Sequence, residues 1–351
     1  MEVTVPVNLT FVLAKIHGMR SRMYEREALE KLLGVRNVLE MMRTVRAGEE
    51  YRSHREFERG LVQRHVAELT DVTRQLRASF REVTESFLRR YQAENLKVIL
   101  RGWVRQTPVE QIKPYLIDLP ERMLLPVEEL LASSGVAGFL GRIPSRVLAE
   151  GARLGVVKFA QTKSTFFMEA GIDRAWLGEL LTRASALHRP HRAGVLRLAG
   201  LEVDQYQVMF VLRSRINYDV APEELREYLL GGPGTRVSLN SLMELASLRN
   251  AGEMLAELRR WRFLTGGAWR GGEPGTSPQK ALEELQAAFE RRLYDVANSV
   301  FYCEFNLSAV LAFFYLKRTE LANLIVMTEA LRYDIPRPET ATRMVGSAVE
   351  E

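Results

Sequence analysis

The sequence is poor in the residues that carry most enzyme chemistry and covalent cross-linking. Only one of its 351 residues is a cysteine, Cys303, and only five are histidines. A single cysteine cannot form a disulfide within the chain, and this usage fits a reducing, cytoplasmic compartment. Because Cys303 stands in an apolar stretch, we expect it to be a small buried hydrophobic residue without a chemical role.

Catalytic and cofactor-binding motifs are missing as well. His188 and His191 form the one close histidine pair, and Pro190 between them disfavours a helical pair of metal ligands. The sequence contains no Gly-x-x-x-x-Gly-Lys-Ser/Thr phosphate loop, no Gly-x-Gly-x-x-Gly fingerprint and no His-Glu-x-x-His motif. We therefore predict that the chain is not an enzyme and has no cofactor, no metal and no small-molecule substrate.

Only one long stretch is nearly free of charge. Val296–Leu316 spans 21 residues with Glu304 as its only charged side chain. A membrane span needs about 20 apolar residues. A carboxylate together with Asn298 and Asn306 would be costly in lipid. We predict a buried helix of a soluble domain here, and no membrane span.

Lysine is also scarce, although the chain is basic. Lys and Arg total 49, of which eight are Lys, against 44 Asp and Glu, for a net charge of +5. Acids and bases are interspersed, as in Glu25-Arg26-Glu27, which is typical of solvated helix faces. We expect no nucleic-acid partner, and an arginine-rich nucleic-acid-binding protein stays open as an alternative.

What the sequence does have is helical periodicity over most of its length. Apolar residues recur at three- and four-residue spacings, with good helix formers between them, in Met19–Arg46, Phe57–Arg105, Leu196–Arg215, Val237–Phe263 and Ala281–Arg332. Val3–Val7 has the alternation of a short extended tail, and 266–278 has the glycines of a flexible loop. The pattern predicts an all-α fold.

Proline and glycine divide this helical sequence into near thirds. The breaks are Gly231-Gly232-Pro233-Gly234 and, earlier, the series Pro108, Pro114, Pro120 and Pro126. We predict three helical domains, over residues 1–120, 121–233 and 234–351.

The three thirds share an internal repeat. Each has a polar amide in a long helical stretch and then a proline that opens a new element: Asn95 and Pro108, Gln207 and Pro222, Asn323 and Pro336. The amide and the proline are 13, 15 and 13 residues apart. Proline suits the first turn of a helix. An amide on an apolar helix face needs a partner. We predict that the amide ties its helix to neighbouring backbone.

Four strings carry a resemblance to a known family. Phe11–Leu33 has an arginine-rich segment before a leucine-rich helix, and the three amides lie in Tyr91–Gly102, Leu201–Arg213 and Leu316–Pro336. These strings resemble the d-type central-stalk subunit of vacuolar and archaeal (V/A-type) rotary ATPases. The second copy departs from the others because Gln207-Val208 stands where they have Asn-Leu, and 266–278 looks like an insertion.

The resemblance implies both a fold and a role. It implies three related helical domains arranged as a funnel with pseudo-threefold symmetry. The funnel would be a non-catalytic central-stalk socket that couples the rotor shaft to the membrane ring, in proton or sodium transport and ATP synthesis. Its partners would be the central shaft subunits and the membrane rotor ring, and it would lie peripherally on the cytoplasmic face of the membrane.

Two further expectations accompany this resemblance. Bases at the ends of two equivalent helices are candidates for the partner interface, namely Arg101, Arg105, Arg213 and Arg215. An unrelated helical-repeat scaffold remains the other alternative to the socket.

Overall fold

The computed structural model describes residues 9–25, 27–46, 49–267, 269 and 277–346. Within these residues the chain forms α-helices and short 3-10 helices and no β-strand, so the all-α prediction is confirmed. Val3–Val7 and most of the loop 266–278 lie outside the described residues.

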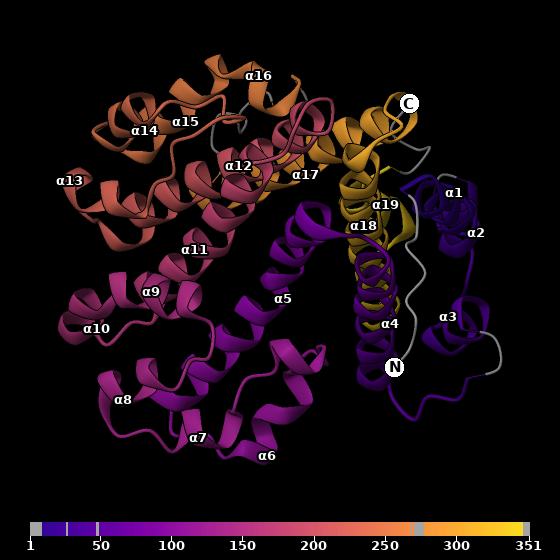
Figure 1. Ribbon diagram of the computed structural model, residues 1–351, viewed down its shortest axis with the longest axis horizontal. Coiled ribbons are helices and arrows are strands. Elements are labelled where there is room, and N and C mark those ends of the chain that lie inside the picture. The colour runs from indigo at the N-terminus through magenta and orange to yellow at the C-terminus, as the bar shows by residue number, and fades with distance from the viewer. Residues whose placement is uncertain (1–8, 26, 47–48, 268, 270–276, 347–351) are drawn as a thin grey trace.

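Three long helical hairpins form the framework (Figure 1). They are α4 (His54–Arg74) with α5 (Ala78–Val104), α11 (Phe166–Ser185) with α12 (Arg192–Tyr218), and α17 (Pro278–Cys303) with α18 (Leu307–Arg332). The first helices of the three hairpins begin at residues 54, 166 and 278, which is a spacing of 112 residues each time.

Short helices precede and follow each hairpin. Before the first are α1 (Leu9–Arg20), α2 (Glu27–Leu33) and α3 (Val38–Val45). Between the first two hairpins are α6 (Val109–Ile112), η1 (Lys113–Tyr115), η2 (Glu121–Met123), α7 (Val127–Leu131), α8 (Gly135–Gly141), α9 (Arg146–Leu154) and α10 (Val156–Thr162). The remaining ones are α13 (Pro222–Leu225), η3 (Arg226–Tyr228), α14 (Leu239–Ala246), α15 (Ala251–Arg260), α16 (Arg262–Thr265) and α19 (Arg337–Arg343). The predicted domain boundaries near 120 and 233 both fall between helices.

Each long second helix ends in the same way. Gln106, Asp219 and Asp334 adopt the left-handed conformation, with φ of 55°, 45° and 53°. Such a residue stops a helix and turns the chain away from its axis. The predicted prolines follow. Pro108 and Pro336 immediately precede α6 and α19 as their N-cap residues, and Pro222 is the first residue of α13.

Several predicted elements need correction. Four of the five long helical stretches are interrupted, namely Met19–Arg46, Phe57–Arg105, Val237–Phe263 and Ala281–Arg332. Val296–Leu316 is not one helix but the tip of the third hairpin, because the Asn306 side chain accepts a 2.7 Å hydrogen bond from Ser308 N and starts α18. Cys303, at this tip, is exposed rather than buried.

Among the described residues, no helix is both long enough and apolar enough to cross a bilayer.

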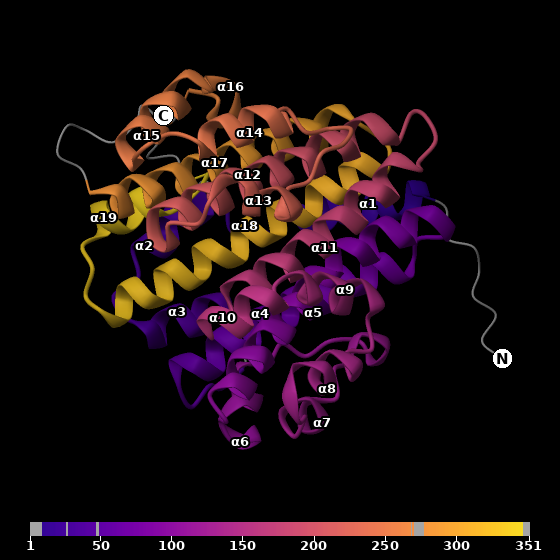
Figure 2. The ribbon, with the colours of Figure 1, turned by 90° about the vertical axis from the view of Figure 1, so that its left-hand side faces the viewer.

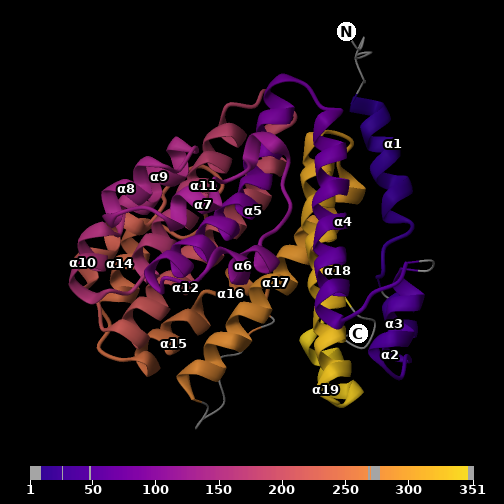
Figure 3. The ribbon, with the colours of Figure 1, turned by 90° about the horizontal axis from the view of Figure 1, so that it is seen from below.

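Every hairpin packs against the other two. α5 packs on α11, α12 packs on α17 and α18, and α18 packs on α4. Figure 3 shows α4 and α18 side by side, with α1 beyond them. In Figure 2, α11, α12, α17 and α18 lie across the molecule next to one another. The largest buried apolar cluster accordingly draws residues from all three hairpins.

The tightest helix crossing is between α9 and α11. A Cβ atom built on Gly151 would lie 2.4 Å from the carbonyl oxygen of Gly171, and one on Gly171 would lie 2.0 Å from that of Gly151. Because both atoms that would be met are backbone atoms, no side chain can move aside to make room. The two glycines therefore set the distance between these helices.

Replacing Gly171 by alanine should separate the helices and destabilise the protein by about 1–3 kcal/mol, the usual cost of overpacking. Gly18→Ala is the matched control, since nothing lies within 4 Å of a Cβ at Gly18 and alanine favours the helix. Urea unfolding of both variants measures the effect. A Gly171→Ala protein as stable as the Gly18→Ala protein would contradict the crossing described.

Candidate functional site

The three hairpin tips meet around His191, which immediately precedes α12. The His191 ring packs edge-on against Phe80 near the start of α5, with 4.6 Å between ring centroids. At the start of α18, Leu307 N donates to His191 Nδ1 at 3.4 Å, and Ser308 Oγ donates to the His191 carbonyl at 3.2 Å. The amino-terminal ends of α5, α12 and α18 are thus together, and the three helices leave this point in parallel.

Equivalent residues of these three helices are buried in layers beyond the tips. Twelve residues before each amide lies an aliphatic layer, formed by Val83, Val195 and Leu311. Eight residues before each amide lies a partly aromatic layer, formed by Phe87, Ala199 and Tyr315. Phe87 and Tyr315 touch edge to face, with centroids 5.1 Å apart. A step of four residues followed by a step of three is the spacing with which parallel helices bury a common seam.

The next layer, five residues before each amide, consists of charged residues. Glu202 of α12 lies between Arg90 of α5 and Arg318 of α18. Its Oε1 accepts from Arg90 Nη1 at 2.7 Å and from Arg318 Nη1 at 2.5 Å. Its Oε2 accepts from Tyr315 Oη at 2.6 Å, and Arg318 Nη2 reaches Glu290 of α17 at 2.9 Å. One carboxylate therefore joins all three hairpins.

The electrostatics of this cluster keep Glu202 ionised. Burial alone would raise the pKa of Glu202, but the charges of Arg90 and Arg318 and the hydrogen bonds from Tyr315 and Arg318 outweigh burial and lower it. Burial, together with the Glu202 charge, raises the pKa of Tyr315 well above its usual value, so its hydroxyl stays a donor. The buried charge is thus fully surrounded by donors.

A cleft of about 420 Å³ adjoins the ion cluster, between α5, α11, α12 and α17. Its lining includes five carboxylates, those of Glu94, Glu169, Asp173, Glu202 and Glu290, and three cations, those of Arg90, Lys97 and Arg213. Lys97 Nζ contacts Asp173 Oδ1 and Glu94 Oε1, both at 2.9 Å. Carboxylates outnumber cations among the lining residues, while Arg318 and Arg101 approach Glu202, Glu290 and Glu169 from outside the lining.

The three predicted amides make equivalent contacts. Asn95 bonds both backbone groups of Ile117, with its Nδ2 donating to the carbonyl and its Oδ1 accepting from the amide, each at 2.8 Å. Asn323 does the same with Val345 at 2.8 and 3.0 Å, and Gln207 Oε1 accepts from Leu230 N at 3.0 Å. In each case the long helix holds the segment that comes after its short helix. Gln207 differs in that its Nε2 donates to Asp204 Oδ1, at 3.4 Å, rather than to backbone. All these contacts lie within the fold.

A second polar position lies three residues before each amide, and the sequence analysis above does not predict it. Gln92 Nε2 donates to Met123 O at 3.0 Å, and Asp204 Oδ2 accepts from Arg236 N at 2.8 Å. In both cases the bonded backbone lies where the next group of short helices begins.

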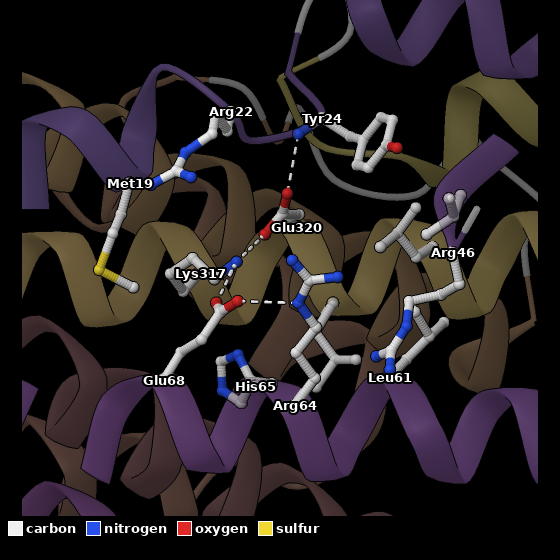
Figure 4. Close-up of a pocket in the computed structure, with 13 residues that line it drawn as sticks. Met19, Arg22, Tyr24, Arg46, Leu61, Arg64, His65, Glu68, Lys317 and Glu320 are labelled. Atoms are coloured by element: carbon white, nitrogen blue, oxygen red, sulfur yellow. Dashed lines mark hydrogen bonds and ion pairs between the residues drawn. The ribbon is translucent and has the colours of Figure 1, made fainter. Parts of the chain in front are cut away.

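The third copy of this position closes the chain on itself. Glu320 Oε1 of α18 accepts from Tyr24 N at 2.8 Å, directly before α2 (Figure 4). Lys317 contacts Glu320 at 2.5 Å and Glu68 of α4 at 2.8 Å. The third hairpin thus holds the beginning of the chain in the same way that each of the first two hairpins holds the segment after it.

The four candidate interface arginines have different surroundings. Arg213 lines the cleft and donates to Gln286 Oε1 at 2.7 Å, while Arg101 lies 3.4 Å from Glu169, another cleft residue. Arg105 is exposed at the end of α5. Arg215 is largely buried and donates to Val220 O at 2.9 Å, so it holds the turn that follows its own helix.

A metal site does not emerge from the described residues, where no group of three His, Cys, Asp or Glu side chains could hold an ion. The fold and the central cluster define an all-helical protein of three hairpins closed around a buried carboxylate. A family model described as ATP synthase (C/AC39) subunit matches residues 12–343. The chain therefore belongs to this family of V/A-type ATP synthase subunits, which excludes the alternative of an unrelated scaffold. No curated protein matches the chain by sequence.

Neutralising the central carboxylate should destabilise the whole protein. In Glu202→Gln, Arg90 and Arg318 lose their shared counter-charge, and removing one partner of a buried ion pair costs about 3–5 kcal/mol. Glu150→Gln is the control, because it removes only an exposed pair with Arg146, which solvent screens, and it should leave the stability nearly unchanged. Urea unfolding measures both.

A variant that replaces the whole cluster distinguishes the loss of ion pairing from the loss of side-chain packing. Arg90→Met, Glu202→Leu, Tyr315→Phe and Arg318→Met together replace the cluster by apolar side chains and should recover most of the stability. Equal stabilities of Glu202→Gln and Glu150→Gln would show that the central carboxylate does not hold the three hairpins.

Proposed function

We propose that this subunit is the non-catalytic central-stalk socket of a V/A-type ATPase or ATP synthase, with its three hairpin units forming a pseudo-threefold funnel. In this role it couples the rotor shaft to the membrane ring and lies peripherally on the cytoplasmic face of the membrane. It performs no reaction and needs no cofactor. Membership in the ATP synthase (C/AC39) subunit family supports the assignment to the rotary complex.

The observation that carries the proposal is the arrangement of α5, α12 and α18. Their amino-terminal halves are joined by the tip contacts, the apolar layers and the ion cluster. Beyond the cluster the cleft begins. This cleft opens between α5, α11, α12 and α17, and helices that are joined at one end beside a cleft suit a part that receives one partner and rests on a second. Its internal packing resists local unfolding under load.

The charge of the cleft indicates the kind of partner that would enter it. Lys97 is shared by Glu94 and Asp173, and the half-exposed Glu94 carboxylate is therefore suited to meet a basic helical tip. Within the same cleft, Arg213 and the neighbouring Arg101 would meet acidic positions of that tip. We therefore propose these two, rather than Arg215, as the interface arginines, and we place them on the shaft side.

The opposite end offers a different surface. At the tip of the third hairpin, Tyr302 and Phe305 are 59% and 76% exposed. Two large exposed aromatic side chains beside a closed end suit a protein interface. We propose that this end faces the membrane ring.

Removing the subunit should separate hydrolysis from transport. Catalysis of ATP hydrolysis needs a phosphate-binding loop, and this chain has none. Complexes assembled without the chain should therefore hydrolyse ATP at the catalytic head but move no ions into vesicles. Adding back the purified chain should restore ion movement. Ion movement that survives complete removal of the chain would exclude the socket role.

Adding back variants of the chain also tests whether the shaft binds in the acidic cleft. A chain with Glu94→Lys should restore coupling less well, and increasingly poorly at low salt, where charge repulsion is least screened. Glu128→Lys, at an exposed ion pair on α7, is the matched control and should restore coupling fully. Equal restoration by both variants would exclude the cleft as the seat of the shaft.

A further inference from the structure

A second cleft lies where the third hairpin meets the beginning of the chain. Its volume is about 230 Å³, and α18 and α4 form two of its walls while residues from α1 to α3 form the third (Figure 4). This second cleft is separate from the acidic cleft, and ligand binding there would not depend on the socket role.

Cations outnumber anions in this second cleft. Its lining includes Arg22, Arg46, Arg64 and Lys317, against only Glu68 and Glu320. Lys317 is shared by both carboxylates, and Arg64 Nε lies 2.9 Å from Glu68 Oε1. The two carboxylates are therefore already engaged, and Arg46 pairs with Glu49 outside the lining, with 2.9 Å from Nε to Oε1. The positive charge that remains without a counter-charge is that of Arg22.

Arg22 is the cation with the least internal compensation. Its Nε donates to Gly18 O, four residues earlier, at 3.2 Å. Within the described part of the chain, no carboxylate pairs with it. In Figure 4 its guanidinium lies between the side chains of Met19 and Glu320. A guanidinium fork in this situation is suited to an oxyanion.

His65 supplies an independent observation. It lines the cleft, its side chain is buried, and its Nε2 lies 2.5 Å from Tyr91 Oη. Its other ring nitrogen, Nδ1, is buried without a hydrogen-bond partner among the described residues. Burial first, and then the nearby charges of Lys317, Arg90 and Arg318, lower the pKa of His65 to about 3, so the ring is neutral. A buried polar group of this kind requires a partner.

We propose that this cleft binds a phosphate group, carried by a free anion or by a small lipid headgroup, with Arg22, Arg64 and Lys317 as its cationic contacts. A phosphate has enough oxygens to engage several cations at once, whereas a chloride ion has no directional acceptor geometry to match a guanidinium fork. The bound group links α18 and α4 to the segment around Arg22. It therefore strengthens the same closure that Glu320 makes with Tyr24 N.

Calorimetric titration of the full chain with sodium phosphate, at ionic strength fixed with sodium chloride, tests this directly. The expected result is saturable binding of phosphate. Arg22→Gln should weaken it about tenfold, the effect of one charge-assisted hydrogen bond. Glu68→Gln should strengthen it, because an anion is removed from the lining. If Arg22 and Glu68 had only packing roles, their substitution would not change the phosphate affinity in opposite directions.

The matched control is Arg142→Gln, since Arg142 also bonds only the carbonyl four residues before it, that of Gly138. It should leave phosphate binding unchanged. Titration with glycerol phosphate, and sedimentation with phosphatidylcholine vesicles with and without phosphatidic acid, identify the source of the phosphate. Binding to phosphatidic acid vesicles alone, lost in Arg22→Gln, assigns a lipid headgroup. No saturable binding to any probe, or equal binding by Arg22→Gln and Arg142→Gln, overturns the proposal.

Discussion

The carboxylate of Glu202 is the constraint on which the rest of the structure depends. Taking a carboxylate out of water costs several kcal/mol, and that cost is offset only where donors surround the charge. Here the donors come from two other hairpins, Arg90 from the first and Arg318 from the third. α5, α12 and α18 must therefore approach in one register. A slip of a single turn in any of them would leave a buried charge without its partner.

The energy of the assembly and its specificity come from different groups. Buried apolar side chains supply the stabilisation, at roughly 1.5–3 kcal/mol for each large side chain removed from water. They do not distinguish one register from another. The ion cluster and the polar positions on the same helices select one register, because an unsatisfied buried polar group costs about 1–3 kcal/mol. The same use of Gln92, Asp204 and Glu320 at three places shows one solution repeated around the molecule.

Local signals in the sequence predicted the local structure well. Periodicity identified the helical regions, and the prolines at 108, 222 and 336 each mark the start of the next helix, Pro222 inside its first turn and the other two at the N-cap. The three amides could be found because a polar side chain in an apolar stretch is conspicuous. The helix breaks were harder. Nothing in the Gln75–Arg77 turn is a proline or glycine, and Cys303 is exposed because the chain turns at Asn306.

The central cluster could not be seen in the same way. Arg90, Glu202 and Arg318 differ in charge, so only counting back from the aligned amides reveals that they are equivalent. A further sign of the repeat was available in the short helices. Asn37 with Glu40, and Asn250 with Glu253, form matching helix caps in the first and third units. The closing contact from Glu320 to Tyr24 N joins residues 296 apart, and no sequence pattern indicates it.

Hydrogen exchange of the intact chain, followed by mass spectrometry, tests most directly whether the three hairpins form one unit around Glu202. The comparison is between the natural protein and Glu202→Gln, with Glu150→Gln as reference. If the carboxylate joins the hairpins, protection should fall together in the amino-terminal halves of α5, α12 and α18. A loss of protection confined to α12 would contradict the account, because it would mean that each hairpin is stable without the shared cluster.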